Sequence, residues 1–316
     1  MTSKSVVADK LVWETDGRDW PNRQYSRFLT AGGLRWHVQV AGSGPALLLL
    51  HGTAASTHSF ADLLPLLAER FTVVAPDLPG HAFTETPPLD RLTLPGMAAA
   101  VGALVRELRV SPEIVVGHSA GAAIGIRMCL DGVIAPRLVV SLSGALLPLR
   151  GFQGAWFAPA AKLFARTGLV PRFVARGARK DPAGVQRLAD GTGSRLTPEG
   201  IERYRTLVAS AGHLAAALNM MANWDLEPLK EDLPGLATPL LLVGFTNDGT
   251  VPPEEAERVR AVLADVPIRL VGGFGHLAHE EDPRHIADLI FEAAAAAGPG
   301  SVSRPGLNPA PPRSAD

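Results

Sequence analysis

The amino-acid sequence predicts an α/β fold: a mostly parallel eight-stranded sheet flanked by helices, with a helical cap inserted after the sixth strand. Short runs rich in Val, Ile and Leu recur along the chain, and they are apolar on both faces, as strands of a covered parallel sheet are. Segments with helical periodicity separate these runs. The alternation stops over residues 146–236, which is why a helical cap is expected there.

The strands can be assigned in chain order. Residues 26–29 and 34–41 are typical of a hairpin added at the edge of the sheet. The apolar runs that follow are expected to be the core strands, at residues 46–52, 71–77, 113–119, 138–144, 239–245 and 268–274. Helices are expected between them, at residues 57–69, 94–108 and 254–264.

The same pattern divides the chain into segments. Residues 26–145 and 237–297 are expected to form the α/β core, and residues 146–236 the cap. Residues 1–25 precede the first strand and are expected to be an N-terminal extension. Residues 298–316 are dominated by Gly, Pro and Ser, which predicts a disordered tail.

The composition is that of an ordinary globular protein, with 47% hydrophobic and 19% charged residues in a chain of 316. The formal net charge of −1 gives no reason to expect nucleic-acid binding. No run of about 18 apolar residues occurs, so no transmembrane helix is predicted. The one cysteine, Cys129, fits a reducing compartment and is interpreted as a small buried hydrophobe. A cytoplasmic location is therefore expected.

The stretch IVVGHSAGAAIG, residues 114–125, carries the first candidate site residue. A serine in G-x-S-x-G between a strand and a helix is typical of a nucleophile elbow, which predicts Ser119 as the nucleophile. Gly117 and Gly121 are expected to permit the tight turn and the close approach of strand and helix. Serine at this point indicates ester, thioester or C–C acyl chemistry, whereas aspartate would indicate a dehalogenase or epoxide hydrolase.

A serine nucleophile needs a base, and the base needs an orienting acid. In this kind of fold both partners follow the serine in the order acid, histidine, each just past the end of a strand. Asp248 follows the run PLLLVG and His276 follows IRLVGG, so they are predicted to complete a Ser-His-Asp triad. Asn247 is the alternative acid position, although an amide stabilises an imidazolium less well than a carboxylate does.

The segment HGTAAS, residues 51–56, is expected to supply half of an oxyanion hole. The backbone N–H groups of Thr53 and Ala120 are predicted to bind the oxyanion, with Ala54 as the substitute for Thr53. The remaining candidates, which are expected to have structural or pocket roles beside the elbow glycines, are His51, Gly52 and His118. The histidines show no tight pairing with a carboxylate on one helix face, so no metal site and no cofactor are predicted.

These motifs, together with DLPGHAFT at residues 77–84, resemble the α/β-hydrolase superfamily over residues 26–295. A closer resemblance covers most of residues 10–290, including the cap. The segments that carry it are AGGLRWHVQVAGSGPALLLLHGTAASTHSF, PDLPGHAFT, VVGHSAGAAIGIRM, SLSGALLPL, GTGSRLTPEGIERY, GHLAAALNMMANWDL and GHLAHEEDP. They are similar to the magnesium-chelatase accessory proteins of bacteriochlorophyll biosynthesis (BchO type). The resemblance implies a role near magnesium insertion into protoporphyrin IX in a phototrophic bacterium, with magnesium-chelatase subunits as partners.

The predicted cap is basic. Residues 150–205 contain eleven Lys and Arg residues against four acids. The basic residues are Arg150, Lys162, Arg166, Arg172, Arg176, Arg179, Lys180, Arg187, Arg195, Arg203 and Arg205. The Phe and Trp residues among them are Phe152, Trp156, Phe157, Phe164 and Phe173. One interpretation is a solvated cap with its aromatic side chains in the core. The other is a surface that holds a tetrapyrrole or another apolar anionic molecule, or that rests peripherally on an anionic photosynthetic membrane.

Two functions are consistent with these features. The first is a serine hydrolase of the ester type that acts in tetrapyrrole biosynthesis near the magnesium-chelatase step, for example on a porphyrin propionate ester. The second is a non-catalytic, porphyrin-binding chaperone that assists magnesium chelatase. The complete set of triad residues favours the first, and the accessory role of the resembling family favours the second.

Overall fold

The computed structural model describes residues 9–148 and 169–298. Its centre is one eight-stranded sheet with the strand order β1-β2-β4-β3-β5-β6-β7-β8. The strand β2 is antiparallel to both of its neighbours, and the other pairs are parallel. The strands are β1 (Ser26–Ala31), β2 (Leu34–Ala41), β3 (Ala46–Leu50), β4 (Thr72–Pro76), β5 (Ile114–His118), β6 (Leu138–Leu142), β7 (Leu240–Phe245) and β8 (Ile268–Val271). The mostly parallel eight-stranded sheet expected from the sequence is confirmed.

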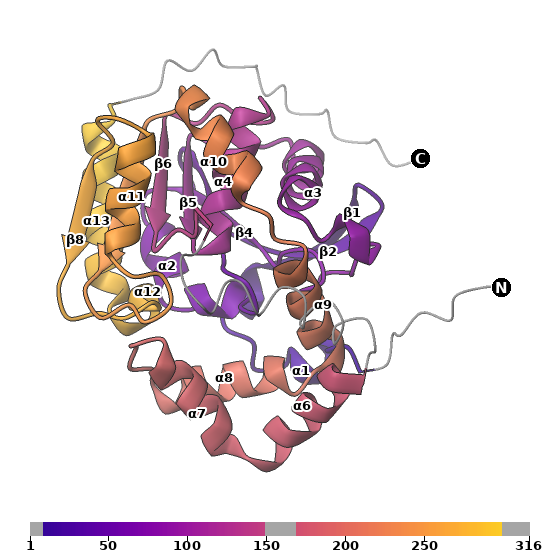
Figure 1. The fold of residues 1–316 in the computed structure, drawn as a ribbon. Coiled ribbons are helices and arrows are strands. Elements are labelled where there is room, and N and C mark those ends of the chain that lie inside the picture. The colour runs from indigo at the N-terminus through magenta and orange to yellow at the C-terminus, as the bar shows by residue number, and fades with distance from the viewer. Residues whose placement is uncertain (1–8, 149–168, 299–316) are drawn as a thin grey trace, which may run out of the picture.

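Helices cover both faces of the sheet (Figure 1). Against one face pack α3 (Leu94–Glu107), α4 (Ala120–Leu130), α10 (Glu227–Asp232) and α11 (Glu254–Val262). Against the other pack α2 (Leu63–Leu67), α12 (Ala278–Glu281) and α13 (Pro283–Ala296). Shorter helices are α1 (Trp13–Asp16), η1 (Arg23–Tyr25), η2 (Thr57–Phe60), η3 (Leu89–Arg91) and η4 (Leu233–Gly235).

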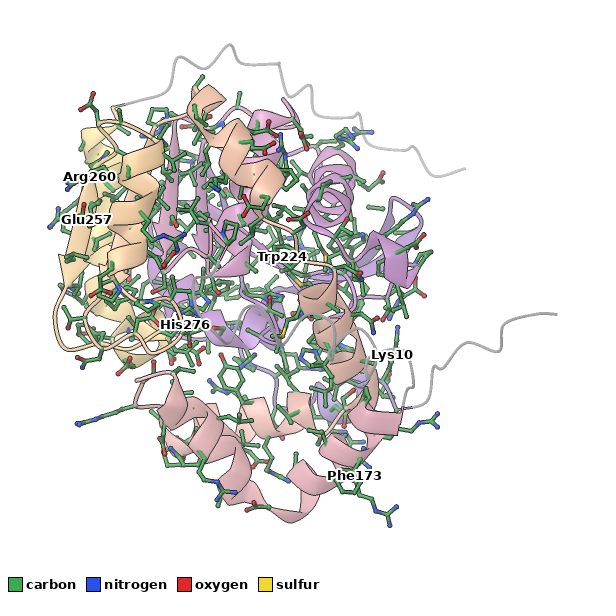
Figure 2. The ribbon with its side chains drawn as sticks, viewed as in Figure 1. Lys10, Phe173, Trp224, Glu257, Arg260 and His276 are labelled. Carbon is green, nitrogen blue, oxygen red and sulfur yellow. The ribbon has the colours of Figure 1, made fainter. Side chains whose placement is uncertain are left out.

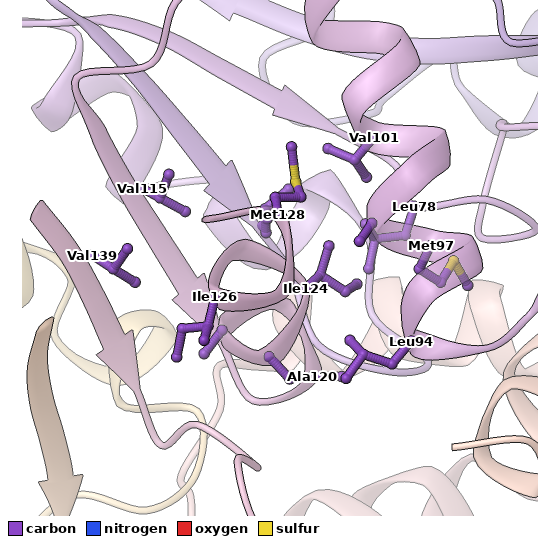
Figure 3. Close-up of a cluster of buried hydrophobic side chains, with 14 of the residues drawn as sticks. Leu78, Leu94, Met97, Val101, Val115, Ala120, Ile124, Ile126, Met128 and Val139 are labelled. Carbon is purple, nitrogen blue, oxygen red and sulfur yellow. The ribbon is translucent and has the colours of Figure 1, made fainter. Parts of the chain in front are cut away.

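The helix α4 is fixed by a fully buried apolar cluster. Met97 and Val101 of α3 meet Ile124 and Met128 of α4 beside Val115 of β5 (Figure 3). Full burial of one such side chain is worth about 1.5–3 kcal/mol. The cluster therefore holds α4, which directly follows the candidate nucleophile, against the sheet.

One helix prediction is wrong. Residues 57–69 form two short helices, η2 and α2, instead of one. Pro65 has no N–H to donate to the carbonyl of Ala61, so a continuous α-helix through this segment would lose a hydrogen bond. The carbonyl oxygen of Ala61 accepts instead from the side-chain amide of Asn22, at 2.8 Å.

The helical cap after the sixth strand is confirmed in the described part of the chain. It contains α6 (Leu169–Lys180), α7 (Pro182–Gly191), α8 (Pro198–Val208) and α9 (Ala211–Ala222), which lie together at one end of the sheet (Figure 1). The helices α6, α7 and α8 enclose a small apolar core of their own, which includes Ala178, Val185, Ala189 and Ile201.

Several sequence predictions concern residues outside the described ranges. They are the tail from residue 299 onward, residues 1–8 of the extension, and the cap residues Arg150, Phe152, Trp156, Phe157, Lys162, Phe164 and Arg166. The exact domain boundaries stay a prediction. Within residues 9–148 and 169–298, no helix combines the length and the apolar character needed to cross a membrane.

Candidate active site

Ser119 lies at the sharp turn between β5 and α4. Its backbone has φ of 52° and ψ of −118°, which L-residues rarely adopt. A Cβ atom at Gly117 would overlap the backbone of Ala122, and one at Gly121 would overlap the carbonyl oxygen of Leu50. Both glycines are therefore required by the close approach of strand and helix. The turn has the geometry of a nucleophile elbow, and the Ser119 side chain is half-buried at the N-terminus of α4.

His276 and Asp248 come together from the loops that follow β8 and β7. Nδ1 of His276 lies 2.8 Å from Oδ2 of Asp248. The other carboxylate oxygen accepts the N–H groups of Thr250 and Val251, each at 2.8 Å. Burial by itself raises the pKa of Asp248, but the hydrogen bond and charge of His276 and the Val251 N–H outweigh it, and the pKa lies below its usual value. Asp248 is therefore an ionised acceptor that orients the imidazole ring with Nδ1 toward the acid and Nε2 away from it.

The structure places Asn247, the alternative acid, away from His276. Its side chain is exposed and accepts a hydrogen bond from the hydroxyl of Thr246 at 3.4 Å. The residue paired with His276 is thus Asp248. Among the described residues, His276 makes no hydrogen bond to the Ser119 hydroxyl, and the link between the two positions runs through His118, which follows Gly117 in the elbow and contacts the His276 backbone.

His118 links the elbow to the histidine loop. Its Nε2–H donates to the carbonyl oxygen of His276 at 3.0 Å, and the two rings lie 4.6 Å apart. Burial, followed by the nearby histidines His279 and His276, holds the pKa of His118 well below its usual range. The ring is therefore neutral near pH 7. The residue that precedes the candidate nucleophile thus holds the backbone of the candidate base.

The loop after β3 lies beside Ser119. A Cβ atom at Gly52 would stand 3.0 Å from Cβ of Ser119 and 3.0 Å from Nδ1 of His118. The N–H groups of Thr53 and Ala120 have no hydrogen-bond partner among the described residues, as a donor reserved for a ligand requires. The Ala54 N–H likewise has no partner among the described residues. Thr53 and Ala54 therefore both stay candidates for this half of the oxyanion hole.

His51 fixes the peptide unit that carries the Thr53 N–H. The backbone N–H of Leu78 donates to Nε2 of His51 at 2.9 Å, so the ring proton is on Nδ1. That proton is donated to the carbonyl oxygen of Gly52 at 2.8 Å. Because the peptide bond is planar and trans, the Thr53 N–H must point the opposite way from this carbonyl. Burial lowers the pKa of His51, which keeps the ring neutral. This geometry supports a structural role for His51.

His213 of α9 is a residue that the sequence did not single out. Its Nδ1 accepts the N–H of Ala82 at 3.0 Å, and its Nε2–H donates to the carbonyl oxygen of Ala54 at 3.1 Å. Ala54 itself has a φ of 63°. Burial lowers the pKa of His213 to about 4. A neutral histidine of the cap therefore joins the candidate oxyanion loop to the loop after β4.

Asp77, within the DLPGHAFT segment, is a second supporting residue that the sequence did not single out. The buried carboxylate lies 2.7 Å from Nδ1 of His37 and accepts the N–H groups of Thr57 and Phe83. Burial by itself raises the pKa of Asp77, but the charge and hydrogen bond of His37 bring it down to about 2. The sequence signal that could have identified Asp77 is an aspartate directly after a strand, with Pro and Gly close behind it. Its partners lie too far along the chain to be read from the sequence.

A buried polar network lies beside the histidine loop. The Tyr204 hydroxyl of α8 donates to Oε1 of Glu280 at 2.7 Å, and the Ser59 hydroxyl donates to the same oxygen. Nε2 of His279 lies 2.7 Å from the Ser59 oxygen. Burial raises the pKa of Glu280 to about 7 and lowers that of His279 to about 3. Tyr204 thus couples the cap to the helix that follows His276.

Two other sites can be assessed in the structure. Burial raises the pKa of the Cys129 thiol to about 11, which is unfavourable for a nucleophile. Across residues 9–148 and 169–298, no group of three or more His, Cys, Asp or Glu side chains is arranged to hold a metal ion.

Known proteins that are similar to this chain are α/β hydrolases. A family model described as the alpha/beta hydrolase family matches residues 47–289. The chain is 35% identical over 277 residues to the magnesium-chelatase 30 kDa subunit of Rhodobacter capsulatus, an alignment that covers 87% of this chain and 96% of that protein.

Solved structures share the fold of this chain. An esterase from a Rhodococcus species matches with a TM-score of 0.68 at 22% identity, over 87% of this chain and all of the other. The epoxide hydrolase CorEH matches with a TM-score of 0.66 at 23% identity, over 86% of this chain and 98% of the other. At such low identity these likenesses show the fold alone, since one fold hosts different chemistries. The family expected from the sequence is confirmed: the chain belongs to the α/β-hydrolase family and is a relative of the magnesium-chelatase 30 kDa subunit.

Proposed function

We propose that this protein is a serine hydrolase of the ester type that acts in tetrapyrrole biosynthesis near the magnesium-chelatase step. The observation that carries the proposal is the His276–Asp248 hydrogen bond of 2.8 Å, in a chain whose Ser119 occupies a strained elbow. A carboxylate that orients an imidazole beside a serine is the arrangement that activates a hydroxyl for attack on an acyl carbon.

In the proposed reaction, Oγ of Ser119 attacks the ester carbonyl while Nε2 of His276 takes the hydroxyl proton. The ester C–O bond then breaks, and the leaving alcohol receives that proton from His276. Water, activated by the same nitrogen, hydrolyses the acyl-enzyme and restores Ser119. Asp248 stabilises the imidazolium that forms in each half.

The oxyanion of each tetrahedral intermediate is assigned to the N–H groups of Thr53 and Ala120, with Ala54 as the substitute for Thr53. These donors have no other described partner, and Ala120 is the first residue of a helix, where the helix dipole also favours negative charge. One such donor is typically worth about 3–4 kcal/mol of transition-state stabilisation. Gly52, Gly117 and Gly121 let the two donors approach Ser119.

The cap and the relative support the proposed substrate class. Arg172 and Arg176 are exposed on α6 beside Phe173, which is 81% exposed and lies on the outer face of that helix (Figure 2). A surface with cations next to an aromatic ring suits a flat apolar molecule with carboxylates. Together with the likeness to a magnesium-chelatase subunit, this supports a tetrapyrrole with a propionate ester as the substrate and chelatase subunits as partners.

The same α6 surface supports peripheral contact of an otherwise cytoplasmic protein with an anionic photosynthetic membrane. Exposed Arg residues attract an anionic surface, and an exposed Phe side chain can enter its interfacial layer. On this proposal the protein co-sediments with anionic vesicles at low salt and is released as the salt concentration rises.

A second candidate function is a non-catalytic, porphyrin-binding chaperone for magnesium chelatase. The observation that favours it is the 35% identity to a protein named as a chelatase subunit. On this alternative the elbow and the Asp248–His276 pair persist without turnover.

The test compares the wild type with Ser119→Ala in two assays. One follows hydrolysis of p-nitrophenyl acetate and of a protoporphyrin methyl ester, and the other titrates protoporphyrin IX binding by fluorescence. The proposal expects Ser119→Ala to lower turnover by about 10⁴-fold or more while binding is retained. Porphyrin binding by both proteins, with no turnover by either, would establish the chaperone instead.

A further inference from the structure

We propose that the loop between α7 and α8 (residues 192–197) positions the acid and the base of the candidate triad relative to each other. The inference rests on the proposed hydrolase function, and it concerns groups of the cap that the reaction itself does not use. Its basis is a set of backbone contacts to both triad loops.

One carbonyl oxygen joins the two triad loops. The oxygen of Thr192 accepts the N–H of Gly249 at 3.1 Å and the N–H of His276, also at 3.1 Å. The first donor directly follows Asp248, and the second belongs to the candidate base itself. Two loops that follow different strands are therefore held by the same atom of the cap.

A second contact fixes the peptide unit after His276. The N–H of Leu277 donates to Oγ of Ser194 at 2.8 Å. Ser194 is buried, so this bond is shielded from competing water. With the Thr192 contact, the N–H groups of His276 and of its successor are both held by the cap loop. The backbone orientation of His276 is thereby fixed from outside the core.

Glycines make this approach possible. Gly193 has a φ of 78°, and a Cβ atom there would overlap the carbonyl oxygen of Asn247. A Cβ atom at Gly275 would overlap the backbone of Gly193 and Ser194 in turn. The cap loop therefore touches the residue before Asp248 and the residue before His276, backbone against backbone.

The relative position of Asp248 and His276 affects the proposed chemistry because the hydrogen bond between them is directional. A misplacement of about 1 Å in a catalytic arrangement can cost on the order of 10²-fold in rate. Any side chain at residue 193 has to push Asn247 away from the cap, and Asp248 moves with it. The loop thus controls the separation of the acid and the base without contacting either side chain.

Gly193→Ala is the direct test, and Gly191→Ala is the matched control. Gly191 ends α7 two residues earlier, and a Cβ atom there would meet nothing within 4 Å. We expect Gly193→Ala to lower kcat for p-nitrophenyl acetate by about 10²-fold, with KM changed little. Gly191→Ala is expected to keep the wild-type kcat. Ser194→Ala, which keeps the backbone conformation, is expected to lower kcat by about 10-fold, since it removes one of the contacts only.

A second readout does not depend on turnover. Amide hydrogen exchange of Gly249, His276 and Leu277 reports the hydrogen bonds to the cap loop directly. We expect these amides to exchange faster in Gly193→Ala, that of Leu277 faster in Ser194→Ala, and none of them faster in Gly191→Ala. If the wild type has no esterase activity, the proposed function fails while the exchange pattern still decides the role of the loop.

The inference is overturned by either of two results. One is wild-type exchange at these amides, or a wild-type kcat in an active enzyme, in Gly193→Ala. The other is faster exchange throughout the chain with a fall in melting temperature that accounts for the lost activity, which would make the loop an ordinary structural contact. Local exchange at the three amides with a selective loss of kcat establishes the positioning role.

Discussion

The two halves of the candidate site are held in different ways. The oxyanion half is held by side chains: His51 of the core fixes the Gly52 carbonyl, and His213 of the cap binds the Ala54 carbonyl. The acid–base half is held from the cap mainly by backbone: the Thr192 carbonyl binds the N–H groups of Gly249 and His276. Two side chains add to this, since the Ser194 hydroxyl accepts the Leu277 N–H and His118 of the core donates to the His276 carbonyl. Both halves contact the cap, but through different chemistry.

This difference predicts which substitutions each half tolerates. A half held by buried neutral histidines responds to loss of an imidazole, because each ring both donates and accepts at a defined distance. A half held by main-chain contacts responds to added volume, because a backbone carbonyl is present whatever the side chain. The predictions below separate the two, beginning with the largest effect.

Asp248→Asn is expected to have the largest effect. An amide in place of the carboxylate neither stabilises the imidazolium nor selects the tautomer of His276, and in other triad enzymes this change costs about 10⁴-fold in kcat. Asn247→Ala is the control, since the Asn247 side chain is exposed and does not contact His276. Steady-state hydrolysis of p-nitrophenyl acetate measures both. Equal losses in the two variants would contradict the assignment of Asp248.

Glu280→Gln tests the buried network on the acid–base side. The pKa of Glu280 is raised by burial to about 7 in the folded protein, above its ordinary value of 4.5. The folded state therefore favours the neutral carboxyl, and stability is lost as the pH rises from about 4.5 through about 7. The loss is on the order of 3 kcal/mol.

Glutamine stays neutral, so the variant is expected to gain stability relative to the wild type over that pH range and to keep a constant advantage above it. Urea unfolding of both proteins at pH 4.5, 6 and 8 measures the difference. A difference that does not change with pH would show that Glu280 does not titrate in this range.

His213→Ala tests the oxyanion half and is expected to have a smaller effect. It leaves the Ala54 carbonyl and the Ala82 N–H without their buried partner, which loosens the loop but keeps the contacts of His51. A fall in kcat of about 10-fold is expected, less than the loss of a whole oxyanion donor. Met221→Ala, at an exposed residue of the same helix, is the control. Similar kinetics for the two variants would remove His213 from the site.

Much of the fold was predictable because its signals are local. Apolar runs of strand length located the core strands, and the G-x-S-x-G turn located Ser119. The helix expected at residues 57–69 failed on a local detail, since Pro65 cannot donate to Ala61. Asp248 and His276 could be proposed because each follows a recognisable strand, and the structure brings those two side chains together.

The supporting contacts were not predictable for a physical reason. The His213–Ala54 bond joins residues 159 positions apart, and the Thr192 contacts involve only main-chain atoms, which every residue has. A contact made by a backbone carbonyl does not require any particular residue type at that position. Its traces among the described residues are the glycines at the contact, Gly193 and Gly275, where a Cβ atom would overlap backbone.

The backbone of Ser119 has a consequence for attempts to make this protein more robust. A non-glycine residue with φ of 52° and ψ of −118° carries a conformational cost of about 1–3 kcal/mol, and the surrounding core must hold it there. Glycine at this position would relieve that strain and remove the candidate nucleophile in the same step. Ser119 is therefore a position at which selection for thermal stability and selection for activity act in opposite directions.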